Sequence, residues 1–181
     1  MLELTIGGAE FWNDLTEEFI QVEPTTLTLE HSLISLSKWE SKWNRPFLSD
    51  KPMTDEEVRD YIRCMTITKH VDPTVYAAIS GAEIREVNNY IAAPMTATTF
   101  SQHGQQKRGR PEVMTAEIIY YYMIAYGIPF ECEKWHLSRL LTLIRVCGIK
   151  NAPSKKMNKA AAAKQQRALN AQRRARTGSR G

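Results

Sequence analysis

Apolar and polar residues alternate along the first thirty residues in the way that is typical of β-strands. Leu2, Leu4 and Ile6 fall on one face of such a strand, and the same alternation recurs twice before residue 31. The simplest interpretation is a three-stranded antiparallel meander over residues 1–31. Because so small a sheet is not stable alone, we expect its apolar face to pack against a helix.

Beyond this segment the apolar residues recur at helical spacing, which predicts a helical body over residues 32–149. Two of its helices have recognisable starts. Thr54 can cap the amide of Glu57 while the Glu57 carboxylate returns to Thr54, and this reciprocal pair is a capping box. Ser80 and Glu83 form a second capping box.

The second half of this body contains a loop and two further predicted helices. A Gly-, Gln- and Arg-rich segment over about 97–112 has no periodicity, and we expect it to be the most mobile internal segment. A helix over 115–126 follows, closed by Gly127 and Pro129. A longer helix then runs over about 130–147, and Gly148 stops it in the left-handed conformation. The longer helix is apolar on more than one face, so we expect it to be central to the fold or half covered by another chain.

The last segment, residues 150–181, differs from the rest of the chain in charge. It contains ten lysines and arginines and no acidic residue, whereas residues 1–149 carry a net charge of −6. Its many alanines and arginines favour a helix, but few of its side chains are large and apolar, so we expect a basic tail that is helical or disordered. The segments together predict a mostly helical α+β protein.

Composition argues against several classes of protein. The longest apolar runs fall far short of the ~20 residues that a membrane-spanning helix needs, so no membrane partner is expected. No basic stretch precedes an apolar segment at the N-terminus, so no secretory signal is expected. Cys64, Cys132 and Cys147 are an odd number at unrelated spacings, which favours reduced thiols in a cytosol over a disulfide framework.

Patterns that would indicate catalysis or a cofactor are weak. Cys132 and His136 lie four residues apart and could begin a zinc site, but no second Cys/His pair completes the four ligands of a structural zinc. Nothing in the sequence places a base beside a serine or cysteine nucleophile. The glycines form neither a phosphate-binding loop nor a dinucleotide-binding fingerprint. We therefore expect no enzyme, no metal and no cofactor.

One short motif indicates nucleic acid. Lys107, Arg108 and Arg110 belong to a Lys-Arg-Gly-Arg-Pro sequence that resembles the core of the AT-hook, which binds the minor groove of A·T-rich DNA. The basic tail could likewise neutralise phosphates, although it could equally bind an acidic protein surface. Glu131 and Glu133 would face phosphates with the wrong sign if residues 115–147 formed a helix-turn-helix. DNA binding is therefore an alternative, and nucleic acid is not the expected partner.

Several segments taken together resemble a family of tailed-phage proteins, the tail assembly chaperones of long-tailed phages (siphophages). The resemblance runs over nearly the whole chain. The segments that carry it are Ser35–Trp43, Pro46–Leu48, Tyr61–Thr66, Met95–Phe100, Ile128–Cys147 and Leu169–Arg174.

The resemblance implies a non-enzymatic protein made in the cytoplasm of the infected bacterium. Such a chaperone binds the long, aggregation-prone tape-measure protein, helps tail-tube subunits to polymerise around it, and leaves before the virion is complete. A homo-oligomer would be compatible with this role. A virion structural protein of the tail or connector is an alternative that the resemblance hardly separates from the chaperone.

Within this hypothesis, surplus apolar surface on the longer helix would shelter amphipathic helices of the client, and the basic tail would extend its reach. The residues expected to capture apolar side chains are Trp135, Leu137, Leu140, Leu141 and Ile144. The residues expected to make the tail contacts are Arg167, Arg173, Arg174 and Arg176.

Overall fold

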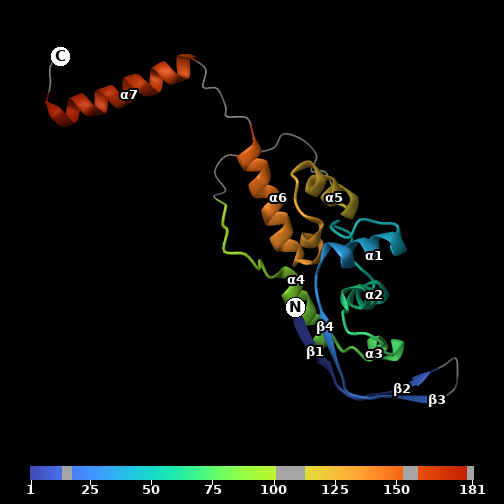
Figure 1. Ribbon diagram of the computed structural model, residues 1–181. Coiled ribbons are helices and arrows are strands. Elements are labelled where there is room, and N and C mark those ends of the chain that lie inside the picture. Colours follow the sequence, from blue (N-terminus) through green and yellow to red (C-terminus); the bar gives the residue numbers. More distant parts are fainter. Residues whose placement is uncertain (14–17, 101–112, 153–158, 179–181) are drawn as a thin grey trace. The chain divides into compact units, whose positions relative to one another are not determined.

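The computed structural model describes residues 1–13, 18–100, 113–152 and 159–178 (Figure 1). The chain divides into two compact units, Met1–Gly148 and Ile149–Gly181. Among the described residues, the strands and most of the helices lie in the first unit, and helix α7 lies in the second. Most of the loop predicted over 97–112 lies outside the described residues.

Helices predominate, which confirms the mostly helical α+β class. Both predicted capping boxes are present. The amide of Thr54 donates to the Glu57 carboxylate at 2.7 Å, and the amide of Ser80 donates to the Glu83 carboxylate at 2.5 Å. The helices are α1 (Leu33–Trp43), α2 (Asp55–Met65), α3 (Pro73–Ala77), α4 (Gly81–Ala92), α5 (Ala116–Ala125), the 3₁₀ helix η1 (Phe130–Lys134), α6 (Leu137–Asn151) and α7 (Lys159–Thr177).

The N-terminal strands form two successive two-stranded ladders, and the predicted three-stranded meander is wrong in this respect. β1 (Leu2–Ile6) pairs antiparallel with β4 (Thr25–Leu29), and β2 (Ala9–Asn13) pairs antiparallel with β3 (Glu18–Val22). Alternation did not reveal β2, because its two large apolar residues are adjacent and break the period of two. The β2–β3 pair is nested between β1 and β4, and each ladder has two strands within the part of the chain that the structure describes.

The first hydrophobic core lies beneath the β1–β4 ladder. Leu4 and Ile6 of β1 and Leu27 and Leu29 of β4 are buried, as their alternation predicts. Burying this apolar face against helices stabilises a ladder that would be marginal in water alone. The other buried members of this core are Val22, Trp39, Tyr61, Ile62, Met65, Val75, Ile79, Val87 and Tyr90.

The second hydrophobic core lies among α1, α5 and α6. Helix α1 contributes to both cores, because Trp39 belongs to the first and Leu33 and Leu36 belong to the second. In Figure 1, α5 lies beside α6. The other buried members of the second core are Ala116, Ile119, Met123, Ile128, Cys132, Leu137, Leu140 and Ile144.

The long helix predicted over about 130–147 is divided into two. η1 ends at Lys134, the backbone of Trp135 is extended (φ −72°, ψ 160°), and α6 begins at Leu137. The amide of Leu137 donates to the carbonyl of His31 at 2.7 Å, and His136 forms a β-bridge with Ser32. These long-range backbone contacts replace the hydrogen bonds that a continuous helix would make.

Gly148 does not stop this helix, because α6 continues to Asn151 with Gly148 inside it. The glycines in the left-handed region are Gly127 and Gly178 among the described residues. A Cβ atom at position 148 would lie 3.1 Å from the Tyr126 hydroxyl oxygen, which is closer than ordinary van der Waals contact. The glycine is therefore explained by the close approach of Tyr126 and not by a helix end.

Candidate partner-binding site

Exposed apolar side chains lie on α5 and on the η1 helix that follows it, and the outer face of α5 is defined here as Tyr121 and Ile124 with Phe130 of η1. Tyr121 is 64% exposed and Ile124 is 66% exposed, and their spacing of three places them on one side of the helix. Phe130 is 54% exposed. Since α5 also buries Ile119 and Met123 on its opposite side, it is apolar around most of its circumference.

The start of α5 is fixed by Glu40 of α1. Thr115 makes no side-chain cap, and the amide of Ala116 donates instead to one Glu40 carboxylate oxygen at 2.7 Å. The other oxygen of Glu40 accepts from the amide of Phe47 at 2.8 Å. Glu40 is buried, so this one carboxylate ties the end of α1 to the first turn of α5.

The end of α5 is fixed by Gly127, as predicted. Gly127 takes the left-handed conformation with φ of 64°, which turns the chain back so that the amide of Ile128 donates to the Met123 carbonyl at 2.8 Å. This reversal leads into η1 and places Phe130 beside Tyr120, with ring centroids 6.3 Å apart.

Tyr120 joins α5 to η1 through its hydroxyl. The hydroxyl donates to the Glu133 carboxylate at 2.8 Å. Burial, together with this hydrogen bond and the negative charge of Glu133, raises the pKa of Tyr120 to about 12. The hydroxyl therefore stays a neutral donor at physiological pH, and its hydrogen bond joins α5 to η1.

The apolar residues expected to bind a client lie mainly inside the protein. Leu137, Leu140 and Ile144 are buried in the second core, so the prediction that they form surplus apolar surface is wrong. Trp135 and Leu141 are half-buried against the same core, and the Arg139 guanidinium stacks on the Trp135 ring at 4.2 Å. The helix is apolar on several sides because it is central, which is one of the two explanations that its sequence allowed.

An exposed apolar surface lies instead on α5, before η1 in the chain. Its sequence signal was the run of tyrosines over 120–122, because hydroxyl-bearing rings are favoured both in cores and at interfaces. The structure divides this run: Tyr121 faces outward, whereas Tyr120 and Tyr122 are half-buried.

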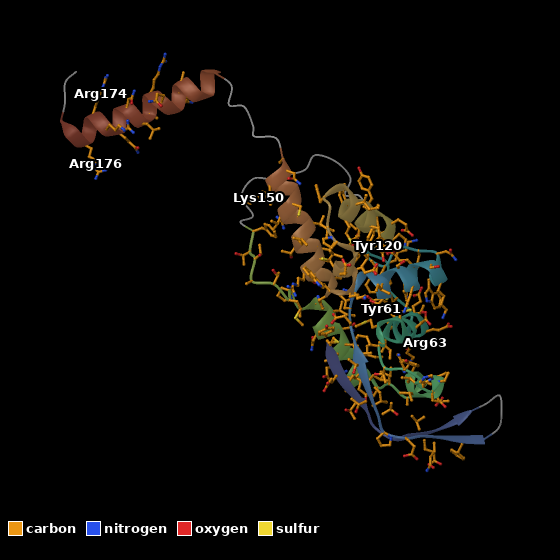
Figure 2. All side chains as sticks on the ribbon, in the orientation of Figure 1. Tyr61, Arg63, Tyr120, Lys150, Arg174 and Arg176 are labelled. Atoms are coloured by element: carbon orange, nitrogen blue, oxygen red, sulfur yellow. The ribbon has the colours of Figure 1, made fainter. Side chains whose placement is uncertain are left out.

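The basic residues predicted to make tail contacts lie on α7, where Figure 2 shows Arg174 and Arg176 projecting from the helix. Arg167 and Arg173 are exposed on the same helix. The only large apolar side chain described on α7 is that of Leu169, which is exposed. Lys107, Arg108 and Arg110 lie outside the described residues.

Two buried histidines form a polar cluster between the cores. The rings of His31 and His136 are 5.1 Å apart; Nδ1 of His31 shares a 2.5 Å hydrogen bond with the Tyr61 hydroxyl, and Nε2 of His136 donates to the Tyr90 carbonyl at 3.1 Å. Burial lowers the pKa of His31 to about 3 and also lowers the pKa of His136. Both rings are therefore neutral at physiological pH, and their hydrogen bonds link segments of both cores.

The part of the chain that the structure describes contains no group of three or more His, Cys, Asp or Glu side chains arranged to hold a metal ion. It also contains no helix both long and apolar enough to cross a membrane. Comparison of the chain with known protein families, with curated proteins and with solved structures found no match.

Proposed function

We propose that this protein is a non-enzymatic tail assembly chaperone of a long-tailed phage, which binds amphipathic helices of the tape-measure protein on the outer face of α5. The observation that carries the proposal is the exposure of Tyr121 and Ile124 on one side of α5, whose first turn is held by Glu40, together with the exposure of Phe130 in the η1 helix that follows. The name of the function comes from the resemblance of the sequence to that family.

The physical basis of capture is the burial of apolar area. An amphipathic helix presents apolar side chains every three or four residues, and Tyr121 and Ile124 have the same spacing. Covering such a helix removes from water the surface through which client molecules would otherwise aggregate. Tyrosine and phenylalanine contribute large contact areas at a low cost in side-chain entropy, which suits a surface that must bind and later release its client.

The arginines of α7 support the same function through charge. A cationic arm raises the rate of encounter with anionic segments of a partner, and it does so more strongly at low ionic strength. The proposal places this activity in the cytoplasm of the infected bacterium, with the tail-tube protein as the second partner. The chain leaves the tail before the virion is complete.

Co-expression with the tape-measure protein encoded in the same phage genome tests the proposal. The tape-measure protein should move from the insoluble to the soluble fraction when this chain is present, and the two should copurify. A client that is equally insoluble with and without this chain would contradict the proposal. Stoichiometric amounts of the chain in purified virions would instead favour a structural component of the tail or connector.

A further inference from the structure

An open hollow of about 390 Å³ lies between the end of α1 and the start of α5. Ser41, Asn44 and Arg45 line it from the side of α1, and Thr115 and Glu117 line it from the side of α5. Because these side chains are polar or charged, the hollow suits a polar group better than an apolar one. Its position next to α5 makes its charge relevant to whatever binds the outer face of that helix.

The end of α1 gives the hollow a negative potential. The last carbonyl groups of a helix have no partner within the helix and carry a partial negative charge. Within the described residues, the carbonyl oxygens of Ser41, Lys42 and Trp43 accept no hydrogen bond from outside the helix. The basic residue of this last turn, Lys42, is paired with Asp60 at 2.5 Å. A cationic group in the hollow would therefore be attracted to the end of α1.

The charged side chains of the hollow favour a cation as well. Arg45 is the cation among the described lining residues, and its guanidinium already pairs with the Glu57 carboxylate at 3.1 Å. The Nε atom of Arg45 has no hydrogen-bond partner in the described part of the chain, but it is buried, so a group in the hollow does not reach it. Glu40 is also buried, and two backbone amides already occupy its oxygens.

Glu117 is the carboxylate that is left to pair with an incoming cation. It is exposed, and within the described residues no ion pair or hydrogen bond engages its side chain. Positions 117, 121 and 124 are separated by four and by three residues, so Glu117 lies on the same side of α5 as Tyr121 and Ile124. A helix that covers these two apolar side chains would continue, about one turn further, beside Glu117 and the hollow.

We propose that the client helix carries a lysine or arginine about one turn beyond its apolar residues, and that this cationic side chain enters the hollow beside Glu117. The inference rests on the proposed function, because it assumes that a helix binds the outer face of α5. An ion pair at an exposed carboxylate is weak, so we expect it to change the affinity by about three- to fivefold. The pair therefore selects among amphipathic helices, while apolar burial supplies most of the affinity.

Fluorescence anisotropy of two labelled synthetic peptides, titrated with the full chain, tests this preference. Both peptides are amphipathic helices with the same apolar stripe. One carries a lysine one turn beyond each end of the stripe and the other carries glutamates there, so the result does not depend on the direction in which the peptide lies. The variants are Glu117→Lys and the milder Glu117→Gln. The matched control, Glu86→Lys, reverses an exposed carboxylate on α4.

At about 50 mM salt, the wild-type chain and the control should bind the lysine peptide about three- to fivefold more tightly than the glutamate peptide, and about 500 mM salt should reduce this preference. Glu117→Gln should weaken the preference, and Glu117→Lys should abolish or reverse it. A preference that persists in Glu117→Lys would overturn the inference, and so would tighter binding of the glutamate peptide to the wild-type chain.

A variant that carries Tyr121→Ser and Ile124→Ser separates this inference from the proposed function. It should bind both peptides more weakly, because it removes the apolar contacts that they share. If the wild-type chain binds both peptides equally and this variant binds neither, the proposed function stands and only the preference for a cation is overturned. If the wild-type chain binds neither peptide, the result counts against the proposed function and overturns the inference with it.

Discussion

The two oxygens of the Glu40 carboxylate accept hydrogen bonds from two backbone amides that lie far apart in the sequence, those of Phe47 and Ala116. Both bonds are in or near the interior, where an amide without an acceptor is costly. The first turn of α5, and with it the outer face that we propose as the client site, therefore depends on one side chain of α1.

Replacing Glu40 by glutamine tests this dependence. The Glu40→Gln variant keeps one acceptor oxygen and turns an NH₂ group toward the second amide, so the free energy of unfolding should fall by about 1–3 kcal/mol. Urea denaturation measures the change. The exposed substitution Glu86→Gln should change the stability by less than about 0.5 kcal/mol, and equal effects at both positions would contradict the role of Glu40.

The buried histidines predict how stability depends on pH. Folding lowers the pKa of His31 and of His136 below the ordinary value near 6.5, so the unfolded chain binds more protons than the folded one below that pH. Stability should be fully present above about pH 6.5 and should fall as the pH drops toward 3, by up to about 1.4 kcal/mol per pH unit for each histidine. The hydrogen bond to the Tyr90 carbonyl and, less strongly, the carboxylate of Glu30 oppose the lowering of the His136 pKa, so His31 should dominate.

Urea denaturation at pH 7.5, 6.5 and 5.5 measures this slope. The His31→Phe variant lacks the main titrating group, so its stability should fall less steeply than that of the wild type, even if its stability at pH 7.5 is lower. The His70→Asn variant serves as the control, because His70 is exposed and asparagine tolerates its positive φ of 58°. An unchanged slope in His31→Phe would contradict the assignment.

At the scale of elements, α6 shows how a local rule and a tertiary contact compete. Glycine inside a helix costs about 1 kcal/mol relative to alanine, yet Gly148 occupies such a position. The Tyr126 hydroxyl oxygen would lie 3.1 Å from a Cβ atom there, so the close packing of α6 against the end of α5 accounts for the glycine.

A double-mutant cycle at these two positions tests the packing. Gly148→Ala should gain less than the intrinsic helix preference of about 1 kcal/mol in the wild-type chain, because Tyr126 must move. In a Tyr126→Phe background, which removes the crowding oxygen, the same substitution should stabilise the protein by nearly that amount. Equal effects of Gly148→Ala in the two backgrounds, measured by urea denaturation, would show that the contact does not matter.

The sequence-based predictions were correct where the interactions are local in the sequence and failed where they join distant residues. The capping boxes at Thr54 and Ser80 and the stop at Gly127 were predicted correctly, because their signals lie within a few residues of the helix ends. The nested pairing of the strands and the interruption of the helix at Trp135 were not predicted. Both depend on contacts between residues far apart in the sequence, such as the hydrogen bond from the Leu137 amide to the His31 carbonyl. No local pattern could show them.

The candidate site was affected by the same limit. An apolar run alone does not say which side of a helix is buried, so Leu140 was predicted as surface although it lies in the second core. The cap that Glu40 gives to α5 joins residues 76 positions apart, and neither end of it has a sequence signature. Only the three-dimensional structure shows that Tyr121 and Ile124 are exposed.

At the scale of the whole molecule, the chain separates its chemistries along its length: acidic strands, helices with an exposed apolar face, and a cationic helix. Such a division suits a protein that acts by binding other macromolecules. The outer face of α5 should contribute to binding and not to folding. Tyr121→Ser with Ile124→Ser should therefore change the free energy of unfolding by less than about 1 kcal/mol, as measured by urea denaturation.

The most direct test combines that variant with the tape-measure protein. The client should be expressed with the wild-type chain, with the variant that carries Tyr121→Ser and Ile124→Ser, and with Ile67→Ser, which replaces another exposed isoleucine outside α5. We predict that the wild-type chain and Ile67→Ser hold the client in the soluble fraction and that the double variant, though folded, does not. A folded double variant that keeps the client as soluble as the wild type does would contradict the claim that the outer face of α5 captures it.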